Sequence, residues 1–184
     1  MQRILYDTAT TMNGYIADDT NSLSWLFAVS SDSADGLVPG DATVLVMGST
    51  TYEWVLDEGD ILANPAKWKE FHGDRPTFVF TTRHLPRPEG ADVRFVRGPV
   101  IDVVPALRAA ADDGDIWVVG GGDLAGQFAD SDALDGIALS VAPVVLDGGA
   151  ALLPRRIESD RLRLVSAAAH GQFARLVYEV ARAV

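Results

Sequence analysis

The sequence predicts an α/β fold in which a central mixed, mostly parallel sheet carries helices on both faces and ends in an antiparallel C-terminal edge. Strand-like and helix-like segments alternate through most of the chain, whereas three strand-like runs follow one another at its end. The last two runs are joined by His170-Gly171-Gln172, which is a hairpin signal. With 184 residues, 48% of them apolar, we expect a single domain spanning 1–184.

The predicted strands are apolar runs bounded by turn residues. Residues 41–48 are nearly all apolar, as expected for a strand whose two faces are both covered. A turn-prone Met-Asn-Gly stretch separates the first strand from a short extended segment. We expect strands over residues 3–9, 15–17, 41–48, 76–83, 91–98, 115–122, 136–146, 160–170 and 173–183.

Three helices are predicted between these strands, over residues 49–56, 102–113 and 122–130. Ser49 is a suitable N-cap for the first of them. Pro105 fits the second helix if it falls in the first turn, where its missing N–H is not needed. In the third, Leu124 and Phe128 are four residues apart and therefore share one face.

The composition narrows the classes of partner. The chain has 26 acidic residues against 15 Lys and Arg, a formal net charge of −11. This charge repels phosphate backbones and anionic lipid, so we expect no nucleic acid and no membrane as partner. The absence of cysteine excludes disulfides and thiolate metal sites. Together with the lack of a signal peptide or apolar span, this predicts a soluble cytoplasmic protein.

Three motifs lie at the carboxyl ends of predicted strands, where parallel sheets bind their ligands. The Gly120-Gly121-Gly122 triplet opens a helix, and so does the segment from Gly48 to Thr51; helix N-termini offer free N–H groups to anions. The third motif, residues 81–83, adds two hydroxyls and a guanidinium suited to a phosphate monoester. Each motif alone has a structural explanation: a tight turn, an ordinary helix cap and a solvated arginine. Their conjunction favours a nucleotide.

Four segments of the chain form a recognisable series: TMNGYIADDTNSLSWL, VLVMGSTTYEWV, IWVVGGGDLAGQFA and LSVAPVVLDGGAALLP. In the same order, they resemble motifs of the dihydrofolate-reductase-like superfamily, and in particular of stand-alone proteins related to the C-terminal reductase domain of the bifunctional riboflavin-biosynthesis deaminase/reductase. The resemblance covers almost the whole chain. It implies the superfamily's three-layer fold and NADPH (NADP) as hydride donor for a small substrate.

The resemblance also implies a set of cofactor-binding residues. Backbone groups of Ala9 and Ile16 would hold the nicotinamide, and the turn after the second long strand would bind the phosphate and the adenine-side ribose. Residues 81–83 would bind the 2′-phosphate. The glycine-triplet region would line the pyrophosphate and the nicotinamide side. The implied residues are Ala9, Ile16, Gly48, Ser49, Thr50, Thr51, Thr81, Thr82, Arg83, Gly120, Gly121, Gly122, Asp123 and Leu124.

On the substrate side the chain departs from the family it resembles. Tyr15 and Gly120 stand where riboflavin-pathway reductases often carry Lys and Glu, and Asn13 replaces the Asp of the opening motif. No acid maps onto the pocket carboxylate of dihydrofolate reductases, and Ser24 replaces the Asp of an Asp-Trp-Leu motif. The catalytic groups stay unknown, and the candidates for the substrate pocket are Asn13, Trp25, Tyr52 and Ser140.

Two hypotheses of function remain open at this stage. The chain is an NADPH-dependent reductase of a small heterocyclic (pterin- or pyrimidine-like) or carbonyl substrate, or it is a non-catalytic nucleotide- or pterin-binding protein of the same fold. No metal site is predicted, because the three histidines, His72, His84 and His170, are scattered and expected at the surface.

We expect a homodimer formed through the C-terminal strands, because their apolar residues exceed what one sheet face needs and an uncovered edge invites pairing. The alternative is that helices of the same chain cover these strands. The residues concerned are Leu162, Leu164, Phe173, Leu176, Val177 and Val180.

Overall fold

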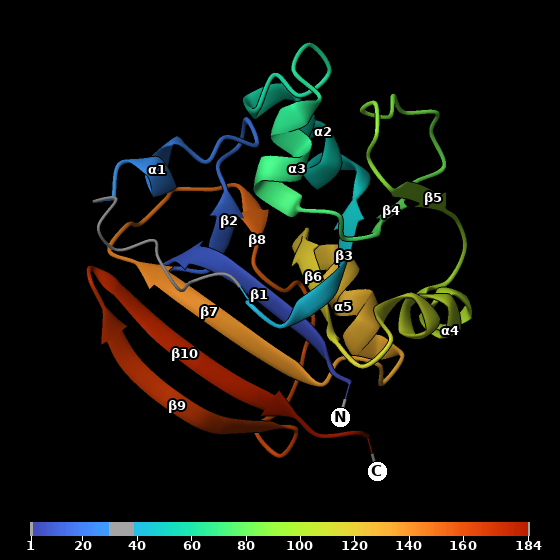
Figure 1. Cartoon of the computed structure of the whole chain (residues 1–184). Helices are drawn as coiled ribbons and strands as arrows, with labels where there is room; N and C mark the ends of the chain where they lie inside the picture. The colour runs from blue at the N-terminus through green and yellow to red at the C-terminus, as the bar shows by residue number, and fades with distance from the viewer. Residues whose placement is uncertain (1, 30–38, 184) are drawn as a thin grey trace.

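The computed structural model describes residues 2–29 and 39–183. Its main feature is an eight-stranded sheet in the order β5-β4-β3-β6-β1-β7-β10-β9 (Figure 1). All neighbouring pairs from β5 to β7 are parallel, whereas β10 runs antiparallel to both β7 and β9. The mixed, mostly parallel sheet with an antiparallel C-terminal edge is therefore confirmed.

The strands follow the predicted order closely. The long strands lie where the sequence places apolar runs, and their ends differ from the predicted bounds by a few residues. The strands are β1 Ile4–Thr11, β2 Tyr15–Ala17, β3 Ala42–Gly48, β4 Thr77–Phe80, β5 Val93–Val96, β6 Asp115–Gly120, β7 Gly136–Ala142, β8 Ala150–Ala151, β9 Leu162–His170 and β10 Phe173–Val180. The helices are α1 Ser24–Phe27, α2 Ser49–Glu58, α3 Ala66–His72, α4 Val100–Ala111 and α5 Gly122–Asp130.

Helices cover both faces of the parallel part of the sheet. Side chains alternate along β3, so Val44 and Val46 enter one core with residues of α4 and α5. Leu45 and Met47 enter a second core on the opposite face with residues of α2 and α3. This double burial explains why the strand is apolar at almost every position.

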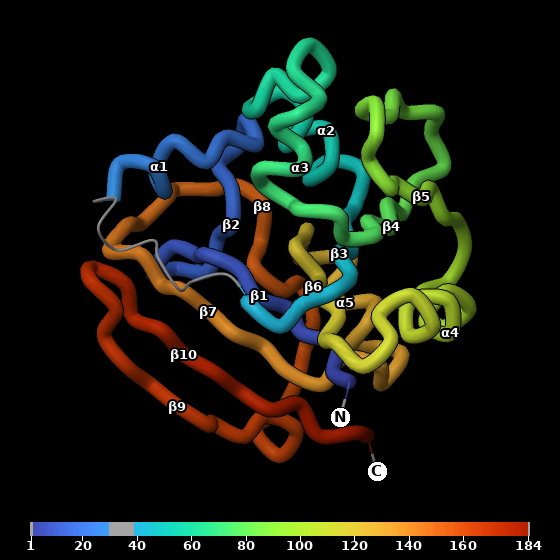
Figure 2. The backbone as a smooth tube through the Cα atoms, viewed as in Figure 1, coloured from blue at the N-terminus to red at the C-terminus, as the bar shows by residue number. Residues whose placement is uncertain are grey.

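The antiparallel end of the sheet is a hairpin of β9 and β10 joined by Gly171, which has φ +56° (Figure 2). β9 is the edge strand of the sheet, and residues 163–169 are exposed. A separate antiparallel pair of β2 and β8 lies beside the carboxyl end of β1. It brings residues 150–151 close to the start of α5.

Several local expectations need correction. Gly48 rather than Ser49 is the N-cap of α2, and no side chain caps that helix. α4 begins at Val100, which places Pro105 in its second turn rather than its first. The sequence analysis also missed α1, α3 and β8, which are short and lack a clear period. Among the described residues, no helix has the length and apolar character needed to cross a membrane.

Candidate functional site

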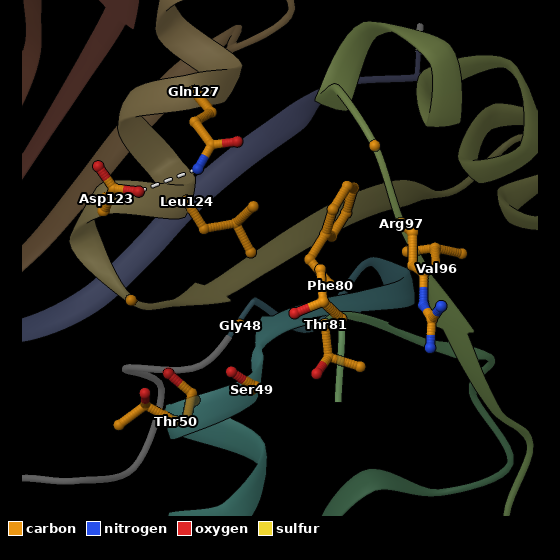
Figure 3. A pocket seen from close by; sticks show the side chains of 14 residues that line it. Gly48, Ser49, Thr50, Phe80, Thr81, Val96, Arg97, Asp123, Leu124 and Gln127 are labelled. Carbon is orange, nitrogen blue, oxygen red and sulfur yellow. Dashed lines mark hydrogen bonds between the residues drawn. The ribbon is translucent and has the colours of Figure 1, made fainter. Parts of the chain in front are cut away.

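The carboxyl ends of four parallel strands meet around a cavity of about 430 Å³. β3 ends at Gly48, β4 leads into Thr81, β5 leads into Arg97, and β6 ends next to Gly121. All four of these residues line the cavity, which we call the small cavity (Figure 3). The geometry brings together the three sequence motifs and adds a fourth strand end.

Two helices begin at the small cavity. α2 starts at Ser49, directly after Gly48, and α5 starts at Gly122, directly after Gly121. Both caps are glycines without side chains, so no side-chain oxygen occupies the first N–H groups of either helix. Free N–H groups and the positive end of the helix dipole favour an anion at each of these two helix ends.

The three consecutive glycines serve three different purposes. Gly120 has φ +150°, a conformation that side chains rarely adopt. A Cβ on Gly122 would lie 2.3 Å from the backbone oxygens of Ala151 and Leu152, so glycine is needed there for close packing against β8. A Cβ on Gly121 would meet nothing nearer than 4.0 Å. The surrounding atoms therefore leave space for a side chain at Gly121, which lines the cavity.

One cation faces the small cavity. Among the described residues that line it, Arg97, in the loop after β5, is the only arginine or lysine. The hydroxyl side chains of Thr81 and Thr82 line the same cavity. Arg83 does not line the cavity, because its guanidinium donates two hydrogen bonds to Glu53 of α2, at 2.8 and 2.5 Å. The sequence analysis overlooked Arg97, which it placed inside the predicted strand 91–98. In the structure β5 ends at Val96, so Arg97 directly follows the strand. The implied role of Arg83 stays a prediction.

The negative charge of Asp123, in the first turn of α5, is offset by neighbouring hydrogen-bond donors. Its carboxylate accepts hydrogen bonds from Gln127 at 2.9 Å and from Arg155 at 3.0 Å. The Gln127 hydrogen bond and, second to it, the Arg155 guanidinium lower the pKa of Asp123. The pairing with Arg155 reduces the repulsion that this carboxylate would otherwise exert on an anion at the helix N-terminus.

A larger cavity of about 690 Å³ adjoins the small one. Both are lined by Thr50, Thr51, Gly121 and Asp123, so they form one continuous groove across the sheet edge. The walls of the large cavity are apolar, and the rings of Phe27 and Trp54 stack in it with centroids 6.3 Å apart. Further apolar lining residues are Leu23, Leu26, Val29, Val55, Val119 and Phe173.

A buried polar cluster forms one side of the large cavity. Asp7 of β1, 4% exposed, accepts hydrogen bonds on both carboxylate oxygens from Arg175 of β10, at 2.7 and 2.6 Å. Arg175 also donates to the Ser140 hydroxyl of β7 at 2.9 Å. The Trp117 indole donates to the backbone oxygen of Asp7 at 2.8 Å. Burial raises the pKa of Asp7, and Arg175 opposes that shift. Asp7, Ser140 and Trp117 all line the cavity.

The structure brings most of the implied cofactor-binding residues to this groove. Ala9, Ile16 and the backbone around the glycine triplet lie at the large cavity, and the residues after β3 and β4 lie at the small one. In full, the residues that line one or both cavities are Ala9, Ile16, Gly48, Ser49, Thr50, Thr51, Thr81, Thr82, Gly120, Gly121, Gly122, Asp123 and Leu124.

Of the four substrate-pocket candidates, Ser140 lines the large cavity and the other three lie elsewhere. Asn13 is outside because its side chain fixes a turn, donating to the backbone oxygen of Leu146 at 2.6 Å. Trp25 is buried in a small core cluster. Tyr52 packs in the core beneath α2 and donates to the backbone oxygen of Pro86 at 2.7 Å.

The sequence analysis missed Asp7 and Arg175, which the structure places at the large cavity and beside it. A signal was present: each is a charged residue inside a predicted strand. Such a residue is either at the sheet surface or paired, and the pattern of one strand does not show which.

Comparisons with known proteins agree with this geometry. Over 177 residues, 95% of each chain, the sequence is 27% identical to the uncharacterized protein YwjB of Bacillus subtilis (strain 168). A structure from Shewanella sp. PV-4, named for riboflavin biosynthesis, has a TM-score of 0.74 at 23% identity, covering 99% of this chain and 100% of that one. Dihydrofolate reductase of Enterococcus faecalis, solved with NADP(H), has a TM-score of 0.61 at 15% identity, covering 97% and 96%. The family model of the RibD C-terminal domain matches residues 2–173. The chain therefore belongs to the RibD C-terminal domain family, a group with a reductase-like fold.

Proposed function

We propose that the protein is an NADPH-dependent reductase that transfers a hydride to a small heterocyclic or carbonyl substrate. The observation that carries this proposal is the continuous groove at the strand ends. Its small cavity combines two helix N-termini with Arg97, whereas its large cavity is apolar. A dinucleotide has the same division, with anionic phosphates in one half and a flat neutral ring in the other.

The residues present fit NADPH. Gly121 leaves open space where a Cβ would project, so a pyrophosphate can approach the backbone there. Arg97, Thr81 and Thr82 supply a guanidinium and hydroxyls for the 2′-phosphate. When bound, NADPH supplies the hydride, and the apolar walls exclude water from the acceptor and hold it in position. The NADP(H) complex of the dihydrofolate reductase above supports this assignment.

Titration with NADPH and NADH, followed by tryptophan fluorescence, tests the cofactor. Arg97→Ala should weaken NADPH binding about tenfold or more and NADH binding much less, because a hydrogen bond to a charged group contributes about 1.5–3 kcal/mol. Arg83→Ala is the matched comparison, since Arg83 is paired with Glu53 outside the cavity. If each variant lost affinity for NADPH and for NADH to the same extent, neither arginine would bind the 2′-phosphate.

Turnover is tested by NADPH oxidation against a panel of pterins, pyrimidines and quinones. We expect oxidation with at least one planar heterocycle of the panel. Saturable NADPH binding without oxidation of any panel member would instead favour a non-catalytic binding protein of the same fold. Absence of NADPH binding would contradict the proposed function altogether.

We also propose that the protein acts as a homodimer joined through the hairpin of β9 and β10. The support is the exposure of β9, whose Leu164 and Val165 are 53% and 51% exposed at the edge of the sheet. The exposure of residues 163–169 is evidence against the alternative that described helices of the same chain cover β9.

A further inference from the structure

The position of Asp123 serves folding but works against the binding of an anion. It lies in the first turn of α5, where the positive end of the helix dipole favours a carboxylate. It also lines both cavities, together with Gly121. A carboxylate at a helix start can accept hydrogen bonds from the first free N–H groups, and those groups are then lost to a ligand. Asp123 is therefore a competitor, within the chain, of any anion at this helix end.

Two side chains hold this carboxylate aside. Gln127, one turn further along α5, donates to Oδ2 of Asp123 at 2.9 Å (Figure 3), and Arg155 donates to Oδ1 at 3.0 Å. No side-chain oxygen caps the start of α5. The first N–H groups of the helix thus stay free of the carboxylate that lies nearest to them in the chain.

Arg155 lies along α5 and bridges its two ends. Its Nε donates to Asp130, the last residue of the helix, at 2.7 Å, while its Nη2 reaches Asp123 in the first turn. Its Nη1 donates to the backbone oxygen of Pro154 at 2.8 Å, which fixes the guanidinium to its own segment. Arg155 itself lines neither cavity. A short-range effect of Arg155 on a ligand in the groove must therefore pass through Asp123.

Gly126 makes room for this bridge. It is buried in the interior of α5, where glycine is less favourable than alanine. A Cβ at Gly126 would lie 2.8 Å from Cγ and 2.9 Å from Cζ of Arg155. The reason for a glycine at this position thus lies outside the helix: it lets the Arg155 side chain lie against the helix backbone.

We propose that Arg155 is a positioning residue for the cofactor. It holds the Asp123 carboxylate away from the N-terminal N–H groups of α5, and Gly126 admits it to the place where it does so. The N–H groups then stay available to the pyrophosphate of a dinucleotide, while Asp123 keeps its favourable interaction with the helix dipole. The inference deepens the proposed function and rests on it, because it names residues that control affinity for the anion without touching it.

Arg155→Met is the direct test, since methionine keeps an apolar stem against the helix and removes the guanidinium. Freed from Arg155, the Asp123 carboxylate should turn onto the helix N-terminus. NADPH affinity, measured by calorimetric titration, should then fall about fivefold, the order expected for the hydrogen bonds that the ligand loses. Unchanged affinity in this variant would overturn the proposal.

The decisive comparison repeats this substitution in an Asp123→Ala background. Without a carboxylate to turn, Arg155→Met should change NADPH affinity less than about twofold. Asp123→Ala by itself should bind NADPH at least as tightly as the unaltered protein, because it removes the competitor. A fivefold loss from Arg155→Met in both backgrounds would overturn the proposal, because a purely structural or a directly electrostatic role does not need Asp123.

Gly126→Ala tests the same mechanism without changing any charge. The new Cβ should push the Arg155 side chain off α5, so NADPH affinity should fall about threefold or more in the Asp123 background. In the Asp123→Ala background the substitution should have little effect. Alanine favours the helix itself, so unfolding of α5 would not explain a loss. Unchanged affinity in the Asp123 background would overturn the role given to Gly126.

Arg156→Met is the matched control for net charge. Arg156 is the next residue in the chain, and its guanidinium pairs with Glu158 rather than with α5. Its side chain is 90% exposed, so Arg156→Met should leave NADPH affinity within about twofold. A loss as large as that in Arg155→Met would indicate a general effect of charge and would overturn the proposal.

Inorganic pyrophosphate separates this inference from the proposed function, because it needs the helix N-terminus but no nicotinamide site. If pyrophosphate binding follows the pattern expected for the variants while NADPH does not bind, the proposed function alone is contradicted. If NADPH binds and Arg155→Met binds it as tightly as the unaltered protein does, the positioning role alone is contradicted. Binding of neither probe would contradict both.

Discussion

At the scale of single residues, His72 does not lie where the sequence predicts it. The sequence analysis expects it at the surface, but it packs against Trp68 at the end of α3, with ring centroids 4.5 Å apart. Its Nε2 is buried and has no hydrogen-bond partner among the described residues. Burial and, second to it, the charge of Arg75 lower the pKa of His72 to about 4.

This burial makes stability depend on pH. Below its unfolded pKa of 6.5, His72 binds a proton in the unfolded chain but not in the folded one, so the free energy of unfolding falls as the pH drops toward about 4. The loss is on the order of 3 kcal/mol. Urea denaturation across this range should show it, and His72→Leu should reduce the slope. His84→Leu, at an exposed position, is the control. An unchanged slope in His72→Leu would contradict the assignment.

At the scale of elements, the turn between β6 and α5 separates folding from binding. Gly121→Ala should leave the melting temperature of the free protein nearly unchanged, because the new Cβ meets nothing within 4 Å other than two contacts at that distance. The methyl group projects toward the proposed pyrophosphate site, so NADPH affinity should fall on the order of tenfold, or about 1.4 kcal/mol.

Gly122→Ala is the matched control for this turn. Its Cβ would collide with two backbone oxygens of the β8 segment, so we expect a loss of stability of about 1–3 kcal/mol. Calorimetry measures the stability of the Gly121→Ala and Gly122→Ala variants, and titration measures their affinity for NADPH. A strongly destabilised Gly121→Ala variant with normal NADPH affinity would mean that the whole triplet serves the turn.

At the scale of the whole molecule, the exposed edge of β9 predicts assembly. Light scattering should give a mass near twice that of the 19.7 kDa chain. Val165→Lys should produce monomers, because it puts a charge into the proposed contact. Ile101→Lys is the control, since Ile101 is 52% exposed on α4, a helix that packs against β3 and β6 rather than against β9. A native mass near 19.7 kDa would exclude the dimer at that concentration.

The sequence by itself determined those features that short-range rules govern. The apolar run of β3 predicts a strand buried on both faces, and the His170–Gln172 turn predicts the hairpin. The Gly120–Gly122 triplet marks a strand-to-helix turn at the edge where parallel sheets bind ligands. These inferences succeed because period, turn chemistry and capping depend on residues only a few positions apart.

The tertiary structure alone decided which side chains meet at the site. Asp7 and Arg175 are 168 positions apart and pair because β7 brings β1 and β10 within reach of one guanidinium. Arg97 rather than Arg83 lines the small cavity because Glu53 engages Arg83. Tyr52 turns into the core rather than into the groove. The order and register of strands fix such contacts, and no pattern within a single segment encodes them.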